Sequence, residues 1–116
     1  MPEACIFCDV AAGKTQTPLL YEDEAVVAFA DIRPIAPTHI LVVPKEHHPT
    51  LLDAASEQDE ALLGRLLRVA GKLAREGLGK DAGCRIVINN GSTAGQTVYH
   101  LHLHLLSGRH FAWPPG

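Results

Sequence analysis

The feature that most constrains the fold is the run Tyr99-His100-Leu101-His102-Leu103-His104-Leu105-Leu106, in which histidine and leucine alternate. Side chains two residues apart share one face of a β-strand, so an extended chain places three imidazoles on one face and the leucines on the other. In a helix, the same spacing would put His102 roughly opposite His100 and His104 and would interrupt the apolar face. The alternation therefore predicts a strand over residues 98–107.

Apolar runs elsewhere predict four more strands and a short helix. Partly β-branched runs indicate strands at residues 19–22 and 25–30, joined as a hairpin, and further strands at 39–43 and 85–89. Two prolines in residues 33–37 predict a loop, because proline cannot donate to a strand ladder. Residues 6–12 are expected to form a short helix that ends at Gly13.

One long helix is expected over residues 57–76, because leucines and alanines recur there at helical spacing. Its apolar face contains Leu62, Leu63, Leu66, Leu67, Ala70, Leu73 and Ala74. Ser56 and Asp59 predict a capping box, and Gly77 and Gly79 predict the end of the helix. The chain is therefore expected to be a single domain, residues 1–116, of the α+β class. We predict a five-stranded, mainly antiparallel sheet with one long helix and a short N-terminal helix.

Charge and composition exclude several functional classes. The formal net charge is −3 with neutral histidines, which does not favour a nucleic-acid binder. No apolar stretch approaches the roughly 18 to 20 residues that span a bilayer, and the N-terminus resembles no secretory signal. Three cysteines are too few for a disulfide framework. We therefore expect a cytoplasmic protein that binds neither membrane nor nucleic acid.

The clustered histidines allow three interpretations: a polar strand face, a metal site and phosphoryl chemistry. His100 and His104 would lie about 13 Å apart on one strand, which disfavours a single ion held by all three rings. A neutral imidazole is a nucleophile at physiological pH, and attack on phosphorus gives a covalent phosphohistidine. Because His102 is flanked by an imidazole on each side, we predict that His102 is the nucleophile and that its neighbours assist.

The segment before the histidines strengthens the phosphoryl interpretation. Residues 90–97 form a glycine-containing polar loop that leads directly into the histidine run. Glycines allow backbone N–H groups to approach an anion, and Gln96 and Thr97 add side-chain donors. We therefore expect this loop to bind phosphate.

The cysteine pair in Cys5-Ile6-Phe7-Cys8 has the two-residue gap that lets both thiolates reach one tetrahedral metal. One such pair is only half a site, so two free thiols are the alternative, and two imidazoles would complete four ligands. A thioredoxin-like redox function is disfavoured because no βαβ pattern follows the pair.

The histidine run resembles the motif of the histidine-triad (HIT) superfamily, and the resemblance extends over nearly the whole chain in the family's order. Further segments that resemble the Hint branch are Phe29-Ala30-Asp31-Ile32, Pro37-Thr38-His39, Val43-Pro44-Lys45, Asn89 with Gly91, Gly95-Gln96-Thr97-Val98-Tyr99 and Trp113-Pro114-Pro115-Gly116. One position departs from the pattern: Thr97 stands where the Hint branch commonly has serine. Because the hydroxyl is kept, we expect a changed substrate preference rather than an inactive enzyme.

The resemblance implies a homodimer that binds purine nucleoside monophosphates and hydrolyses adenosine 5′-phosphoramidates. In that scheme His102 attacks the α-phosphorus, His100 and His39 orient it, and phosphate or leaving-group contacts come from His104, Gln96 and Thr97. Asp31 would bind the ribose hydroxyls. The remaining nucleotide-binding positions would be Ile6, Phe7, Phe29, Ile32, Leu41, Asn89 and Gly95.

The resemblance also implies a structural zinc but no cofactor for catalysis. Its ligands would be Cys5, Cys8, His47 and His100, with His48 as the alternative to His47. Two further functions stay open: a dinucleoside polyphosphate hydrolase or nucleotidyl transferase of the same superfamily, and a nucleotide-binding interaction module with little turnover.

Overall fold

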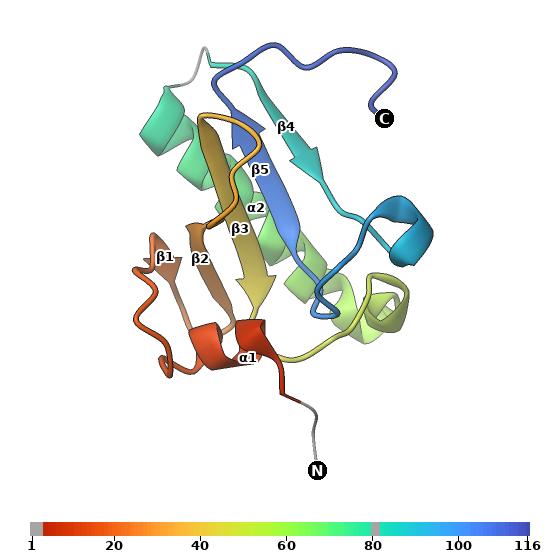
Figure 1. Ribbon diagram of the computed structural model, residues 1–116. Coiled ribbons are helices and arrows are strands. Elements are labelled where there is room, and N and C mark those ends of the chain that lie inside the picture. The colour runs from red at the N-terminus through yellow and green to blue at the C-terminus, as the bar shows by residue number, and fades with distance from the viewer. Residues whose placement is uncertain (1–3, 80–81) are drawn as a thin grey trace.

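The computed structural model describes residues 4–79 and 82–116, which form one antiparallel sheet and two α-helices (Figure 1). The strands lie in the order β1-β2-β3-β5-β4, and every neighbouring pair is antiparallel. Their bounds are β1 Tyr21–Glu22, β2 Val26–Ala30, β3 Thr38–Pro44, β4 Cys84–Val87 and β5 Leu103–Ser107. The predicted α+β class with a five-stranded antiparallel sheet is confirmed.

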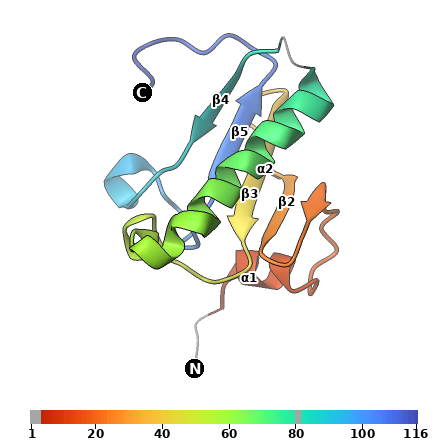
Figure 2. The same ribbon diagram turned by 180° about the vertical axis from the view of Figure 1, so that it is seen from behind.

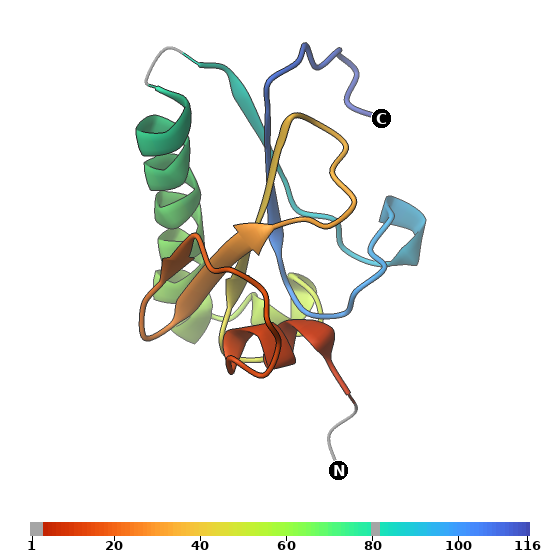
Figure 3. The same cartoon turned by 60° about the vertical axis from the view of Figure 1, so that its left-hand side comes forward.

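The two α-helices lie on opposite sides of the sheet. Helix α2, Glu60–Leu78, crosses one face of the sheet (Figure 2). Helix α1, Ile6–Ala11, lies beside the other face, near the end of β3 (Figure 3). Three 3₁₀ turns complete the description: η1 Leu52–Ala54, η2 Glu57–Asp59 and η3 Ser92–Ala94. None of the helices in the described ranges is long and apolar enough to cross a membrane.

Alternate residues of the central strands build two apolar clusters, one on each face of the sheet. The cluster beneath α2 contains Val26, Ala28, Val42, Leu66, Val69, Ala70, Leu101 and Leu103. The opposite cluster joins α1 to the sheet and contains Phe7, Val10, Val27, Phe29, Leu41 and Val43. Because strand side chains alternate between faces, the leucines of the histidine run enter the first cluster and leave the imidazoles beside the second.

The histidine strand is shorter than the alternation predicts. Strand β5 begins at Leu103, so His100 and His102 precede it instead of lying within it. The backbone groups that would extend the pairing of β5 with β3 form other hydrogen bonds. The Leu101 N–H donates to the His48 carbonyl at 2.6 Å, and the Pro44 carbonyl accepts from the His100 ring. The alternation of faces nevertheless persists, because Leu101 is buried with Leu103.

Other predicted boundaries shift by a few residues. The first strand contains only Tyr21–Glu22, and β4 ends at Val87 instead of residue 89. In the capping box, Asp59 Oδ2 accepts from both the backbone N–H and the hydroxyl of Ser56, but the first turn after it is 3₁₀ and α2 starts at Glu60.

The far end and the apolar face of α2 also differ from prediction. Gly77 lies inside the helix, and the chain leaves it at Gly79, whose φ of 87° suits only glycine. Leu67, predicted for the buried face, is 51% exposed, whereas Val69 is fully buried. The buried face of α2 is therefore rotated slightly relative to the apolar face that the spacing of leucines and alanines predicts.

Gly108, directly after β5, is expected to be a stability-determining position. Its φ is +99°, and a Cβ there would lie 2.7 Å from the Cβ of Pro37. We expect Gly108→Ala to lower the free energy of unfolding by about 2 kcal/mol, since both the backbone conformation and the contact oppose a side chain. Urea denaturation measures this. The matched control is Gly64→Ala on the exposed face of α2, where a Cβ meets open space and a gain of about 1 kcal/mol is expected.

Candidate active site and metal centre

His102 is held in one orientation and one tautomer by the backbone. Its Nδ1 lies 2.6 Å from the carbonyl oxygen of His100. Since a carbonyl can only accept, Nδ1 carries the proton, and the neutral ring keeps its lone pair on Nε2. Burial is the main cause that lowers the pKa of His102 below its usual value, so the ring is neutral at pH 7. The result is a fixed imidazole with an available nucleophilic nitrogen.

His39, His104 and Asp31 form a linked group beside His102. His39 of β3 and His104 of β5 meet at 2.9 Å between Nε2 and Nδ1, and Asp31 Oδ2 lies 3.3 Å from His39 Nε2. The ring centroids of His102 and His104 are 5.0 Å apart. The pKa of His104 is lowered to about 4, mainly by burial and in part by the neighbouring His102 and His39. Burial likewise lowers the pKa of His39.

Aromatic and aliphatic side chains form one wall next to the histidines. Phe7 of α1 packs edge-on against Phe29, with ring centroids 5.5 Å apart, and against His102 at 5.0 Å. Leu41 is buried in the same cluster. The structure thus gathers three of the predicted nucleotide-binding residues, Phe7, Phe29 and Leu41. Two others, Ile6 and Ile32, are 54% and 89% exposed.

The loop that precedes the histidines is held by hydrogen bonds of the Gln96 side chain. Gln96 is buried, and its Oε1 accepts from the Gly91 N–H at 2.8 Å while its Nε2 donates to the carbonyls of Pro49 and Val98. The turn that it supports contains η3 and ends at Gly95, whose φ is 94°. Because the amide is engaged on both sides, the role that the structure gives Gln96 is to hold this loop.

The other loop positions are accessible or only partly covered. Thr97 is exposed and lines a hollow of about 680 Å³ together with Cys5, Cys8 and His47. Asn89 is half-buried beyond the end of β4. The neighbouring Asn90, which the sequence did not single out, accepts from the Leu52 N–H at 3.0 Å and so ties the loop to η1.

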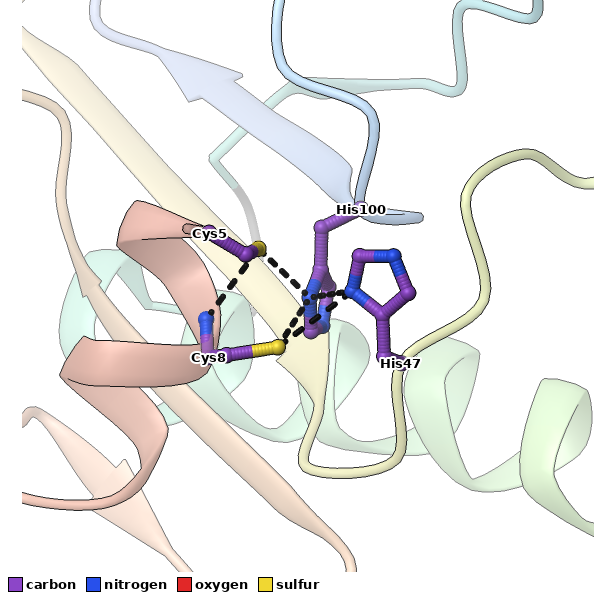
Figure 4. A group of neighbouring side chains, drawn as sticks. All are labelled: Cys5, Cys8, His47 and His100. Atoms are coloured by element: carbon purple, nitrogen blue, oxygen red, sulfur yellow. Dashed lines mark hydrogen bonds between the residues drawn. The ribbon is translucent and has the colours of Figure 1, made fainter. Parts of the chain in front are cut away.

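The predicted metal ligands converge on one point, as Figure 4 shows. Cys5 and Cys8 come from α1 and its N-cap, His47 from the loop after β3, and His100 from the approach to β5. The Nδ1 atom of His100 lies 3.4 Å from Cys5 Sγ, 3.5 Å from Cys8 Sγ and 3.2 Å from His47 Nδ1. All four ligand atoms lie within 4.8 Å of one another.

The chemistry of this cluster fits a tetrahedral zinc ion. His100 Nε2 donates to the Pro44 carbonyl at 2.7 Å, which leaves the lone pair on Nδ1, the atom that faces the other ligands. The pKa of the Cys8 thiol is raised to about 11, mainly by burial and in part by the neighbouring Cys5, so a cation is needed to hold thiolates here. His48 is directed elsewhere, with Nε2 2.8 Å from Glu46 Oε1.

The cysteine–histidine cluster is linked to His102 through one residue, His100. The ring of His100 lies in the cluster, while its carbonyl accepts the hydrogen bond from His102 Nδ1 that fixes the His102 ring. Phe7 contacts both rings edge-on, at 6.0 Å from His100 and 5.0 Å from His102. Movement of α1 or of the His100 ring is therefore expected to change the position of the His102 ring.

The neutral, buried histidines predict that stability depends on pH in the weakly acidic range. Their folded pKa values are lowered, so the unfolded chain binds more protons once the pH falls below the usual value of about 6.5. Stability is then full near pH 7 and falls down to about pH 4, where His104 titrates in the folded protein. We expect at least about 1 kcal/mol to be lost between pH 7 and pH 5, measured by urea denaturation. His104→Asn should flatten this slope; an unchanged slope would contradict the assignment.

Comparison with known proteins agrees with this geometry. Residues 12–111 match the HIT domain. The chain is 47% identical over 116 residues to an uncharacterized HIT-like protein of Synechocystis, with both chains covered completely. The structure of a HIT family hydrolase from Legionella pneumophila superposes with a TM-score of 0.91 at 48% identity, covering 97% of this chain and all of that one. A histidine triad nucleotide-binding protein from Candida albicans superposes with a TM-score of 0.81 at 32% identity, covering 96% of this chain and 83% of that one. The fold, the site and these similarities show that the chain belongs to the HIT family.

Proposed function

We propose that this protein is a nucleotide-binding hydrolase that cleaves the P–N bond of purine nucleoside 5′-phosphoramidates, adenosine derivatives above all. The observation that carries the proposal is the bond from His102 Nδ1 to the His100 carbonyl, which leaves Nε2 free to attack. Two similar structures support the class by their names, one a HIT family hydrolase and the other a histidine triad nucleotide-binding protein.

The reaction proceeds in two displacements at phosphorus. In the first, the Nε2 lone pair of His102 forms a bond to the α-phosphorus, the P–N bond breaks, and the amine leaves with its electron pair and takes up a proton. In the second, water attacks phosphorus, loses a proton, and displaces Nε2 to give the nucleoside monophosphate and the free ring. A neutral ring flanked by hydrogen-bond donors suits both steps.

Nucleotide recognition follows from the surroundings of His102. Asp31, at the end of β2, offers carboxylate oxygens for the ribose hydroxyls. Phe7, Phe29 and Leu41 provide the apolar wall for a purine base. The phosphate then lies between the nucleophile and the loop that Gln96 braces, whose backbone N–H groups are donors for an anion.

We also propose that Cys5, Cys8, His47 and His100 hold a structural zinc ion. Bound zinc would cross-link α1 to the loop after β3 and to the approach to β5, and would take no part in the chemistry.

Assembly is proposed to be a homodimer. The supporting observations are the edge strand β4, which pairs only with β5 among the described residues and carries a 38% exposed Ile86, and Trp113, which is 82% exposed. Sedimentation equilibrium tests this proposal: a mass of two chains supports it, and a mass of one chain over the micromolar range contradicts it.

The test of the proposed function compares AMP release from adenosine 5′-phosphoramidate and from a diadenosine polyphosphate under the same conditions. We expect kcat/KM for the phosphoramidate to exceed that for the dinucleotide by at least about 100-fold, or roughly 2.7 kcal/mol in transition-state binding. The reverse preference would keep the histidine chemistry but contradict the substrate. Tight AMP binding without turnover of either compound would favour an interaction module.

A further inference from the structure

We propose that the backbone N–H of Ile35, in the loop between β2 and β3, is a positioning group that fixes the proton arrangement of His39 and, through it, of His104. The inference rests on the proposed function, because its consequence is a hydrogen-bond donor aimed at the reacting phosphate. Ile35 contributes through its peptide alone, since its side chain is 60% exposed.

The hydrogen bonds define each tautomer in turn. The Ile35 nitrogen lies 3.2 Å from His39 Nδ1, and since a peptide N–H only donates, Nδ1 must hold a lone pair. The proton of neutral His39 is then on Nε2, which lies 2.9 Å from His104 Nδ1 and 3.3 Å from the Asp31 carboxylate, both acceptors. His104 Nδ1 is therefore the acceptor, and its own proton is on Nε2.

The arrangement matters because these rings are neutral at physiological pH. Burial lowers the pKa of both His39 and His104, so hydrogen bonds decide where each single proton resides. With its proton on Nε2, His104 can donate from its outer edge, beside a nucleophile whose ring centroid is 5.0 Å away. A fixed donor stabilises negative charge that develops on phosphoryl oxygens. The opposite tautomer would present a lone pair to that charge.

The same contacts decide against a metal ion at this position. Asp31, His39 and His104 bring their ligand atoms within 4.8 Å of one another, which is close enough for a shared ion. A metal would require a lone pair on His39 Nε2, and the Ile35 N–H keeps the proton there instead. This differs from the cysteine cluster, where the ring nitrogen that faces the other ligands is the unprotonated one.

The loop that carries the Ile35 N–H is itself held by the segment after β5. The Arg109 Nε–H donates to the Ile35 carbonyl at 3.0 Å, and the Arg109 guanidinium stacks on the Phe111 ring at 4.3 Å from its centroid. Pro37 packs so closely on Gly108 that a Cβ would not fit between them. These two contacts anchor the loop on the C-terminal side of the N–H that faces His39.

The tautomers can be read directly in the zinc-supplemented, ligand-free protein. Two-bond ¹H–¹⁵N correlation spectra of ¹⁵N-histidine-labelled protein at pH 7.5 distinguish protonated from unprotonated ring nitrogens. We expect His39 and His104 both to carry their protons on Nε2. A proton on Nδ1 of His39 in the wild-type protein would overturn the proposal, whatever the enzyme does with any substrate.

A pair of variants then tests the peptide N–H. Ile35→Pro removes the N–H, and Ile35→Ala removes only the exposed side chain. We expect Ile35→Ala to keep the wild-type tautomers, and Ile35→Pro to shift His39 toward the Nδ1–H form. We also expect Ile35→Pro to have about tenfold lower kcat than Ile35→Ala at similar KM, the size of one lost hydrogen bond. Identical tautomers and kcat in the two variants would contradict the proposal.

If Ile35→Pro fails to fold, the tautomers seen in the wild-type spectrum still decide whether the proposal holds. Because that spectrum needs no substrate, failure of the proposed function is distinguishable from failure of this inference.

Discussion

His102→Ala is expected to lower kcat on adenosine 5′-phosphoramidate by about 10⁴-fold or more, because the variant lacks the atom that forms the covalent bond. Binding of AMP should change by less than about threefold. Two residues of the apolar wall, Phe29 and Leu41, are paired directly across β2 and β3, so their position does not depend on the His102 ring. Single-turnover release of the amine and calorimetric titration with AMP measure the two quantities separately.

The matched control for this variant is His110→Ala, which removes an exposed imidazole outside the cluster. We expect wild-type kcat and AMP affinity from it. Equal losses of turnover and of AMP binding in His102→Ala would indicate that the ring supports the pocket, and would contradict its assignment as nucleophile.

Removal of the proposed zinc should have the second-largest effect, on stability and on turnover together. The cluster links α1 to two distant segments, so its loss should lower the melting temperature by roughly 10 °C, as expected for several kcal/mol of linked binding energy. Because the carbonyl of His100 fixes His102, kcat should also fall by about 10- to 100-fold. Cys8→Ser and treatment with a chelator should produce the same two changes.

The chain supplies a matched control for the cysteine variant. Cys84→Ser changes an exposed cysteine on the edge strand β4, and neither melting temperature nor kcat should respond. Elemental analysis of the purified protein should give about one zinc per chain. Less than a tenth of that amount, with a melting temperature that the chelator leaves unchanged, would show that the cluster is a set of free thiols and imidazoles.

Much of the fold could be predicted because the decisive patterns are local. The alternation of histidine and leucine fixes which side chains face α2, whether or not each residue belongs to a regular strand. The Ser56 and Asp59 pair likewise located the start of the long helical segment. Boundaries were less accurate, since they depend on distant partners: β5 begins late because the Leu101 N–H donates to His48.

The parts of the site that sequence could not predict are backbone groups. Three such groups have no residue-type signature: the carbonyl of His100 that orients His102, the carbonyl of Pro44 that orients the His100 ring, and the N–H of Ile35. Gln96 was expected to contact phosphate because its side chain is polar, but its distant acceptor, the Pro49 carbonyl, becomes visible only in the folded chain. Side-chain chemistry can be read from sequence, whereas the groups that set its orientation are supplied by the fold.

The central claim is that His102 attacks phosphorus and forms a covalent intermediate, and the stereochemical course at phosphorus tests it most directly. An adenosine 5′-phosphoramidothioate of known configuration is hydrolysed in ¹⁸O-labelled water, and the configuration of the product is determined. Two in-line displacements, one by His102 Nε2 and one by water, predict retention of configuration. Inversion would mean that water attacks phosphorus in a single step, and would contradict the account of His102 as nucleophile.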